Sequence, residues 1–342
     1  KIVDCLIEAY SSINNPQSTI ENGAMRIAPE VHGVLNINKP AGVTSHDVVD
    51  AVRKILGVRR VGHTGTLDPQ ATGVLPLCVG RATRIAQFLT QADKEYVMTL
   101  RLGVTTDTLD AAGKETGRVE DIQVRREDLL AILPRFVGEI QQVPPIFSAK
   151  KYRGERLYRL ARRGEQVERR PVTVRVHALE LLEFAPPFAR LRATCSKGTY
   201  ARSLCDDIGR ALGCGGHLHA LTRTRSGQFS LDGILTPEEL EARVREGRLG
   251  EVLISIADAL AHLPAVRVAP EAGRLILHGG AVAAALVVQF PADLHRGALV
   301  RVLGFRKQLL SLAETTVASP DFAACEPTRV VLHPVRVFTS AA

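Results

Sequence analysis

GHTGTLDPQATGVLPLCVG, residues 62–80, is a glycine-rich loop that leads into an apolar segment. Its glycines permit backbone geometry and a close approach of other chains that larger residues resist. Asp68 precedes Pro69, which favours an extended backbone at Asp68, and a loop between strands can present such a carboxylate to a cleft. The same residues also fit an Asx turn in which Asp68 caps its own loop. On this stretch alone both interpretations stay open, and the turn is the more frequent outcome.

The segments around this loop predict strands and helices in turn. VLNINK, residues 34–39, is a strand candidate that Pro40 ends, and Ser45 then begins a helix that Gly57 ends. Residues 94–103, KEYVMTLRLG, alternate so that Tyr96 and Met98 share one strand face. A short helix is expected at residues 81–89, and further helices at 126–138, from 201 and within 237–262. We therefore expect an α+β fold with a mixed, mainly antiparallel sheet.

Composition places the chain among ordinary globular proteins. Of its 342 residues, 45% are hydrophobic and 23% charged, and no apolar run approaches the length of a membrane span. Its six cysteines form no C-x-x-C pair, which argues against a structural zinc site. Scattered cysteines without an export signal are typical of a reduced compartment, so the sequence predicts a cytoplasmic protein without a metal.

Positive charge is concentrated in one segment. The formal net charge is +8, and residues 149–175 hold ten basic and three acidic residues. Such a local excess, with Tyr152 and Tyr158 inside it, predicts contact with a polyanion. The alternative is a basic helix that is simply solvated.

Three regions follow from these patterns. Residues 1–31 are rich in Asn and Ser and lack periodicity, so we interpret them as a flexible leader or an expression remnant. Residues 32–263 are expected to form the main domain. Beyond a boundary near Pro264, residues 264–342 read as short strands with turns, which predicts a small β-rich domain.

Four long motifs together resemble the TruB family of pseudouridine synthases. They are GVLNINKPAGVTSHDVV (33–49), GHTGTLDPQATGVLPLCVGRATR (62–84), KEYVMTLRLGVTTDTLDAAG (94–113) and CSKGTYARSLCDDIG (195–209). Their order is similar to that of the bacterial tRNA branch of the family. The family commonly has L-R-R-T where this chain has Leu221, Thr222, Arg223 and Thr224, so one basic contact is expected to be missing.

The resemblance implies three catalytic residues. Asp68 matches the family's essential aspartate, Tyr96 the tyrosine that stacks on the target uracil, and Arg202 the arginine that pairs with the aspartate. Arg202 is expected to keep Asp68 ionised and oriented through a charge-assisted pair.

It also implies a set of substrate-binding residues. His63 would stack in the gap that the extruded base leaves, and Tyr200 would line the pocket. Lys39, in the N-K-P motif, would support the active-site loop from beneath. Lys150 and Lys151 lie in the basic segment, which overlaps the family's thumb insertion at about residues 138–171. Residues 264–342 would correspond to the family's PUA-like RNA-binding domain.

The implied reaction cuts the C1′–N1 bond of a uridine and joins C1′ to C5 of the same uracil. No group is lost and no redox change occurs, so no cofactor is expected. The target must first be flipped out of its RNA loop, and the carboxylate either attacks C1′ or removes the C2′ proton. The sequence does not choose between these two routes.

The implied substrate is the T-arm of tRNA, at the loop uridine of conventional position 55. We expect a monomer that needs neither a membrane nor an obligatory protein partner. Two alternatives remain: a guide-RNA-dependent synthase of the dyskerin type, and a catalytically idle RNA-binding or tRNA-folding protein.

Overall fold

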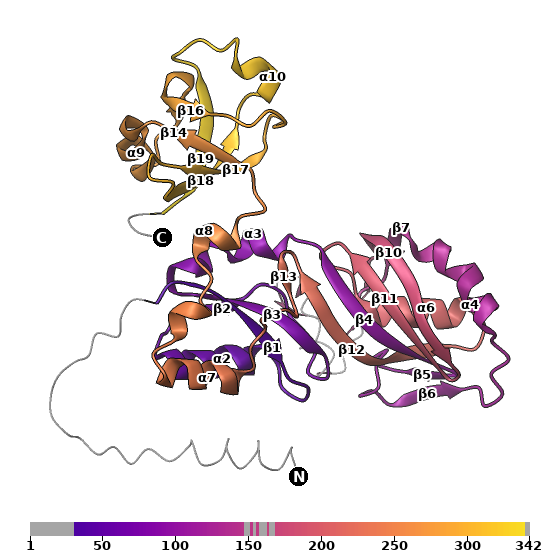
Figure 1. Cartoon of the computed structure of the whole chain (residues 1–342). Helices are drawn as coiled ribbons and strands as arrows, with labels where there is room; N and C mark the ends of the chain where they lie inside the picture. The colour runs from indigo at the N-terminus through magenta and orange to yellow at the C-terminus, as the bar shows by residue number, and fades with distance from the viewer. Residues whose placement is uncertain (1–30, 147–150, 153–154, 157–162, 164–167, 339–342) are drawn as a thin grey trace, which may run out of the picture. The chain divides into compact units, whose positions relative to one another are not determined.

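The computed structural model describes residues 31–146, 151–152, 155–156, 163 and 168–338. Its larger sheet has nine strands within these residues, and Figure 1 shows it running through the main body of the chain. The order is β1 (Gly33–Lys39), β3 (Thr72–Val79), β12 (Gly216–Ser226), β4 (Lys94–Leu102), β11 (Phe188–Cys195), β10 (Val172–Ala185) and β7 (Gly138–Gln142), with β2 (Val61–His63) beside β3 and β13 (Phe229–Ser230) beside β12. Its pairings are antiparallel except that of β12 with β3, as predicted for a mixed, mainly antiparallel sheet.

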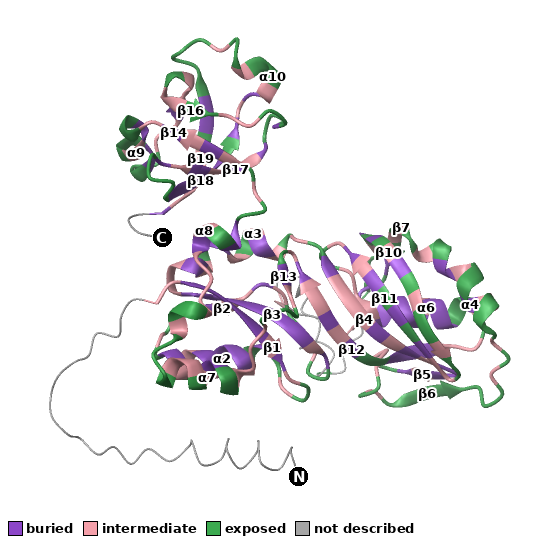
Figure 2. Cartoon of the chain, in the orientation of Figure 1, coloured by how far each residue is buried: buried purple, intermediate pink, exposed green. Residues whose placement is uncertain are grey.

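The helix α2 (Ser45–Leu56) forms where the sequence predicted it. Thr44 caps its start by accepting a hydrogen bond from the Asp47 amide, and Gly57 ends it in the left-handed conformation with φ 64°. Its apolar face packs on β1 and β3 together with α7 (Pro237–Arg245). In Figure 2 the strands of this part of the sheet are buried along most of their length.

A second helix, α6 (Ala201–Ala211), packs on the middle of the sheet. Leu204, Cys205 and Ile208 face β4, β11 and β12 in one apolar cluster. The remaining helical segments of the main domain are η1 (Gly80–Ile85), α3 (Ala86–Thr90), α4 (Arg126–Ile132), η2 (Leu133–Phe136), η3 (Leu249–Glu251) and α8 (Ile256–Ala259).

The expected helix at residues 81–89 begins as a 3₁₀ helix, and the two helices expected within residues 237–262 cover only part of that range. Residues 80–90 form a 3₁₀ turn and then a single α-helical turn, and residues 237–262 form α7, a 3₁₀ turn and a single turn at α8. Gly247, at φ 72°, follows the C-cap residue Glu246 of α7 and fits the end of that helix, because glycine adopts this conformation without strain.

Two-stranded sheets occur at β5 (Val104–Thr106) with β6 (Glu115–Arg118), and at β8 (Lys151–Tyr152) with β9 (Glu155–Arg156) in the basic segment. From Ala265 onward the chain forms a separate six-stranded sheet, one residue after the boundary predicted at Pro264. Its elements are β14 (Ala265–Val268), α9 (Pro270–Leu277), β15 (Val282–Ala283), η4 (Ala284–Leu286), β16 (Val287–Gln289), β17 (Leu299–Leu303), β18 (Leu309–Thr315), α10 (Ser319–Phe322) and β19 (Val330–Val337). Among the described residues, none of the helices has the length and apolarity needed to span a membrane.

Candidate active site

Asp68 and Arg202 form a two-pronged ion pair between the glycine-rich loop and the start of α6. Arg202 Nε lies 2.9 Å from Asp68 Oδ2, and Arg202 Nη2 donates to Asp68 Oδ1 at 3.1 Å. Such fork-to-fork geometry orients the carboxylate in addition to pairing its charge. The arginine side chain is 6% exposed and the aspartate side chain 40% exposed. The guanidinium therefore lies beneath a carboxylate that still faces outward.

Asp110 adds a second acid to the same guanidinium. Arg202 Nη1 lies 3.7 Å from Asp110 Oδ2 and donates to the Thr108 carbonyl at 3.3 Å. Arg202 thus holds Asp68 along one edge and the loop at residues 108–110 along another. Asp110 lies within one of the four sequence motifs, but no role was predicted for it.

The pKa of Asp68 is raised above its ordinary value of 3.8, chiefly because the surrounding protein displaces water from the carboxylate. Arg202 opposes this effect, and the nearby charge of Asp110 adds to it. Arg202 lowers the pKa of Asp68, in the direction expected of a partner that favours the ionised carboxylate. Burial raises this pKa by more, so Arg202 offsets the effect of burial only in part.

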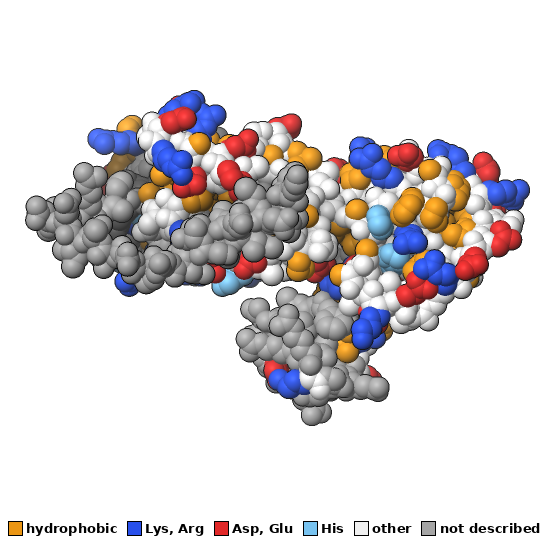
Figure 3. All heavy atoms as spheres, turned by 90° about the horizontal axis from the view of Figure 1, so that it is seen from below, with side chains coloured by type: hydrophobic (Ala, Val, Ile, Leu, Met, Phe, Trp, Pro, Cys, Tyr) orange, Lys and Arg blue, Asp and Glu red, His pale blue; other side chains and the backbone are white. Residues whose placement is uncertain are grey.

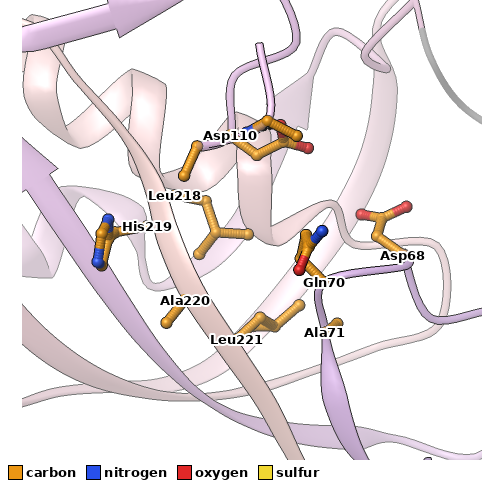
Figure 4. Close-up of a pocket in the computed structure, with 10 residues that line it drawn as sticks. Asp68, Gln70, Ala71, Asp110, Leu218, His219, Ala220 and Leu221 are labelled. Carbon is orange, nitrogen blue, oxygen red and sulfur yellow. Dashed lines mark hydrogen bonds between the residues drawn. The ribbon is translucent and has the colours of Figure 1, made fainter. Parts of the chain in front are cut away.

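A pocket of about 330 Å³ opens beside this pair. Asp68, Gln70, Asp110, His219 and Leu221 are among the residues that line it. Figure 4 shows Asp68 at one side of the pocket and His219 at the opposite side, with Gln70 and Leu218 between them. The volume is near the lower end of the range of about 300–1,000 Å³ that small-ligand sites occupy.

Tyr96 lies on β4 and is paired with β12. It stands directly opposite Arg223 in the strand register, and the guanidinium of Arg223 opposes part of the effect of burial on the phenol. Burial raises the pKa of Tyr96, so its phenol is neutral near pH 7. Its ring packs on the apolar cluster that contains Leu67, one residue before Asp68.

Arg223 joins three parts of this site. It is 1% exposed, its Nε donates to the Val74 carbonyl at 2.7 Å, and its Nη2 donates to the Gly65 carbonyl at 3.1 Å. Gly73, at φ 98°, lets the strands approach here, because a Cβ at that position would lie 2.3 Å from the Arg223 oxygen. In the sequence Arg223 is noticed only because L-T-R-T keeps one of the two arginines of the family's L-R-R-T. The packing of β12 on β3 is needed to show that its side chain is buried and binds two carbonyls.

Lys39 lies beneath the loop, as the N-K-P motif implied, but it does not reach the surface. Its side chain is 0% exposed, and its Nζ donates to the carbonyls of Pro40, Pro69 and Ala71 at 2.8, 2.9 and 2.7 Å. Direct contact with a substrate is therefore excluded, which corrects its place among the substrate-binding residues. Lys39 ties the segment just after Asp68 to the end of β1.

We predict that Lys39→Met destabilises the chain by about 3 kcal/mol or more, since three carbonyls lose this donor and each buried acceptor left without a partner costs about 1–3 kcal/mol. Burial lowers the pKa of Lys39 from 10.5 to about 8. Between these two values the unfolded chain binds more protons than the folded chain, so the stability that Lys39 contributes rises with pH across that window.

Urea unfolding of wild type and variant at pH 7.5 and 9.5 measures both effects, and the gap between the two proteins should widen at the higher pH. Lys54→Met is the matched control, because Lys54 is exposed on α2. Equal unfolding midpoints for wild type and Lys39→Met would show that Lys39 does not anchor the loop.

The remaining predicted residues are placed as follows. His63 ends β2, and its Nδ1 accepts a hydrogen bond from the Gly65 amide at 3.3 Å. Tyr200 precedes α6, where Gln142 of β7 accepts from its amide at 2.9 Å and donates to its carbonyl at 3.3 Å. Lys150 and the side chain of Lys151 lie outside the described residues.

Comparison with known protein families matches most of the main domain. Residues 53–201 match the model described as TruB family pseudouridylate synthase (N terminal domain), and residues 202–261 match the tRNA pseudouridylate synthase B C-terminal domain. The tRNA pseudouridine synthase B of Pelotomaculum thermopropionicum is 43% identical over 289 residues, which are 83% of this chain and 91% of that protein. The enzyme of the same name from Pseudomonas aeruginosa is 45% identical over 262 residues, or 76% and 86% of the two chains.

Solved structures agree with this match. A chain of a Cbf5–Nop10–Gar1 complex superposes with a TM-score of 0.74 at 30% identity, covering 95% of this chain and 91% of that one. A chain of an H/ACA RNP bound to a substrate RNA containing 2′-deoxyuridine gives a TM-score of 0.72 at 29% identity, covering 90% and 85%.

Proposed function

The chain belongs to the TruB family of pseudouridine synthases, and on that premise we propose that it converts the T-loop uridine at position 55 of tRNA into pseudouridine. The observation that carries the proposal is the Asp68 carboxylate, held by the Arg202 fork at the side of a pocket. The alternative of a simple Asx turn gives no reason for a buried arginine to be aimed at this carboxylate.

Asp68, Arg202 and Tyr96 supply what the isomerisation needs. The reaction breaks C1′–N1, forms C1′–C5, releases the C5 proton and leaves a proton on N1. Asp68 acts on the ribose, either as nucleophile at C1′ or as base at C2′. Arg202 keeps that carboxylate aimed, and Tyr96 stacks on the free uracil.

RNA binding is assigned to three further elements. His63, beside the glycine-rich loop, takes the place of the flipped base, and the basic segment at residues 149–175 contacts the phosphate backbone. The six-stranded sheet at residues 265–337 serves as a PUA-like RNA-binding domain. Basic and acidic side chains alternate over the face seen in Figure 3, so affinity is expected to depend on local patches. The enzyme works in the cytoplasm as a monomer without an obligatory partner.

A guide-RNA-dependent mode is the second candidate, because the two solved chains above come from a Cbf5 complex and an H/ACA RNP. The relatives at 43–45% identity are instead named tRNA pseudouridine synthase B, which favours action on tRNA by the chain alone.

Mapping the pseudouridines formed in an unmodified tRNA transcript by the purified chain, with no guide RNA and no other protein, tests this choice. The proposal predicts pseudouridine at position 55 alone. Modification that requires added guide RNA and partner proteins would instead establish the second candidate.

We predict that replacing Lys150, Lys151, Arg162 and Arg163 with Ala weakens tRNA binding and flattens its salt dependence. Each phosphate that the variant no longer neutralises removes about 0.7–0.9 from the slope of log affinity against log salt. Arg163 also pairs with Glu155 at 2.6 Å, so its share is expected to be the smallest.

Filter binding at several salt concentrations measures the slope. The matched control replaces four arginines of the main domain, Arg243, Arg245, Arg248 and Arg210, which pair with neighbouring acids on the surface. If the two quadruple variants have the same slope, the basic segment is only a solvated face.

A further inference from the structure

His219 occupies a β-bulge on β12 beside the active site. Leu218 pairs with Leu100 of β4 and Ala220 pairs with Thr99, so His219 is the extra residue between them. Bulges commonly redirect a side chain next to a functional site. Backbone hydrogen bonds to the loop that carries Asp110 hold the bulge in place. Leu218 donates to the Leu109 carbonyl at 3.0 Å, and Ala111 donates to the Leu218 carbonyl at 3.0 Å.

The imidazole contacts one neighbouring aromatic ring. Its ring lies 5.0 Å from the ring of Phe188 at an interplanar angle of 53°, and the residue as a whole is exposed. Arg101 lies over the Phe188 ring at 6.0 Å, so the aromatic neighbour of His219 is itself packed against a guanidinium.

This ring faces the same pocket as the catalytic carboxylate. Both Asp68 and His219 line it, at opposite sides, with the apolar side chains of Leu218 and Leu221 near the middle (Figure 4). Among the pocket residues named above, His219 is the aromatic one, and the mechanism given for Asp68, Tyr96 and Arg202 does not use it. A ring that neighbouring side chains already orient loses little freedom when a ligand stacks on it.

We propose that His219 is a stacking platform for the nucleobase next to the target uridine in the RNA chain. The inference rests on the proposed function, because the target ribose must reach Asp68 for the chemistry to occur. Flipping one nucleotide out of a loop separates its neighbours from their own stacking partners. His63 is assigned to the gap that the target leaves in the loop. A neighbouring base that is drawn out of the loop together with the target lies outside this gap, and an aromatic ring at the pocket rim can cover it whatever the base is.

The test uses a T-arm stem-loop that carries the fluorescent base 2-aminopurine at the position 5′ or 3′ of the target uridine. In the wild-type complex we expect the probe at one of these positions to be quenched by stacking. His219→Ala should restore its fluorescence and raise the Kd about tenfold. His219→Phe keeps an aromatic face and should retain both the quenching and the affinity.

Single-turnover rates at saturating RNA should stay within about threefold of wild type in both variants, because the contact is the same in ground and transition states. His46→Ala is the matched control, since this histidine lies on α2 with its side chain 71% exposed.

His219→Ala with unchanged fluorescence at both positions and unchanged Kd overturns the platform while leaving the isomerase assignment intact. A Phe variant as weak as the Ala variant also overturns it, because the contact would then be polar. Failure of the wild-type protein to modify tRNA would instead contradict the proposed function.

Discussion

Asp68→Asn is expected to reduce pseudouridine formation below detection while leaving tRNA affinity within about tenfold, or 1.4 kcal/mol. An amide neither attacks C1′ nor removes the C2′ proton, so both routes stop. The fold should persist, because Arg202 keeps Asp110 at 3.7 Å and the Thr108 carbonyl at 3.3 Å as partners. The charge that the substitution removes belongs to a side chain already 40% exposed.

Single-turnover assays with enzyme in excess measure the chemistry, and filter binding measures the affinity. Asp121→Asn is the control, since Asp121 is an exposed aspartate of the same main domain outside the site. Turnover by Asp68→Asn, in a preparation free of wild-type enzyme, would show that another group performs the chemistry.

Arg202→Lys is expected to lower the single-turnover rate by on the order of a hundredfold, because a displacement of about 1 Å in a catalytic group can have an effect of that size. Lysine keeps the charge but lacks the planar fork that binds both oxygens of Asp68 and also reaches Asp110 and Thr108. Affinity for tRNA should change little, since a guanidinium 6% exposed has little access to phosphates.

Arg210→Lys provides a control on the same helix. Arg210 is 69% exposed and pairs with Asp206 at 2.9 Å, so the substitution tests the loss of a guanidinium from an ion pair outside the site.

Arg202→Ala should in addition move the acidic limb of the pH–rate profile to higher pH. Arg202 lowers the pKa of Asp68, and without it the carboxylate ionises only at higher pH. Near-wild-type rates for Arg202→Lys would contradict the orienting role and make Arg202 an RNA contact instead.

Local patterns were sufficient for much of the fold. The helix at Ser45–Leu56 carries its own cap and stop, Thr44 and Gly57, and the alternation of residues 94–102 gives β4. The helix and the strand both depend on residues that are close to one another in the chain, so a local sequence pattern is enough to predict them. Asp68 and Arg202 were likewise named from motifs, although they lie 134 residues apart. Their pairing required the family resemblance, because no local rule joins two such distant residues.

Other parts of the site depend on how distant strands are aligned, and the sequence does not show this alignment. Arg223 is buried because β12 lies against β3 on one side and β4 on the other. The exposure of His219 results from a bulge, and a shift of one residue in register reverses the side of the sheet to which a side chain points. Lys39 was grouped with the substrate-binding residues through the N-K-P motif, which placed it beneath the active-site loop. Three carbonyls from two segments enclose it there, and its own neighbours in the sequence do not show this burial.

The central claim is that this chain alone isomerises the uridine at position 55 of tRNA. Tritium release from a transcript labelled at C5 of its uridines tests it most directly, because forming the C1′–C5 bond expels the hydrogen at C5. The account predicts release of one tritium equivalent per tRNA by the purified protein without cofactor, metal or guide RNA, and none from a transcript with cytidine at position 55. No release from the uridine-containing transcript, or equal release from both transcripts, would contradict it.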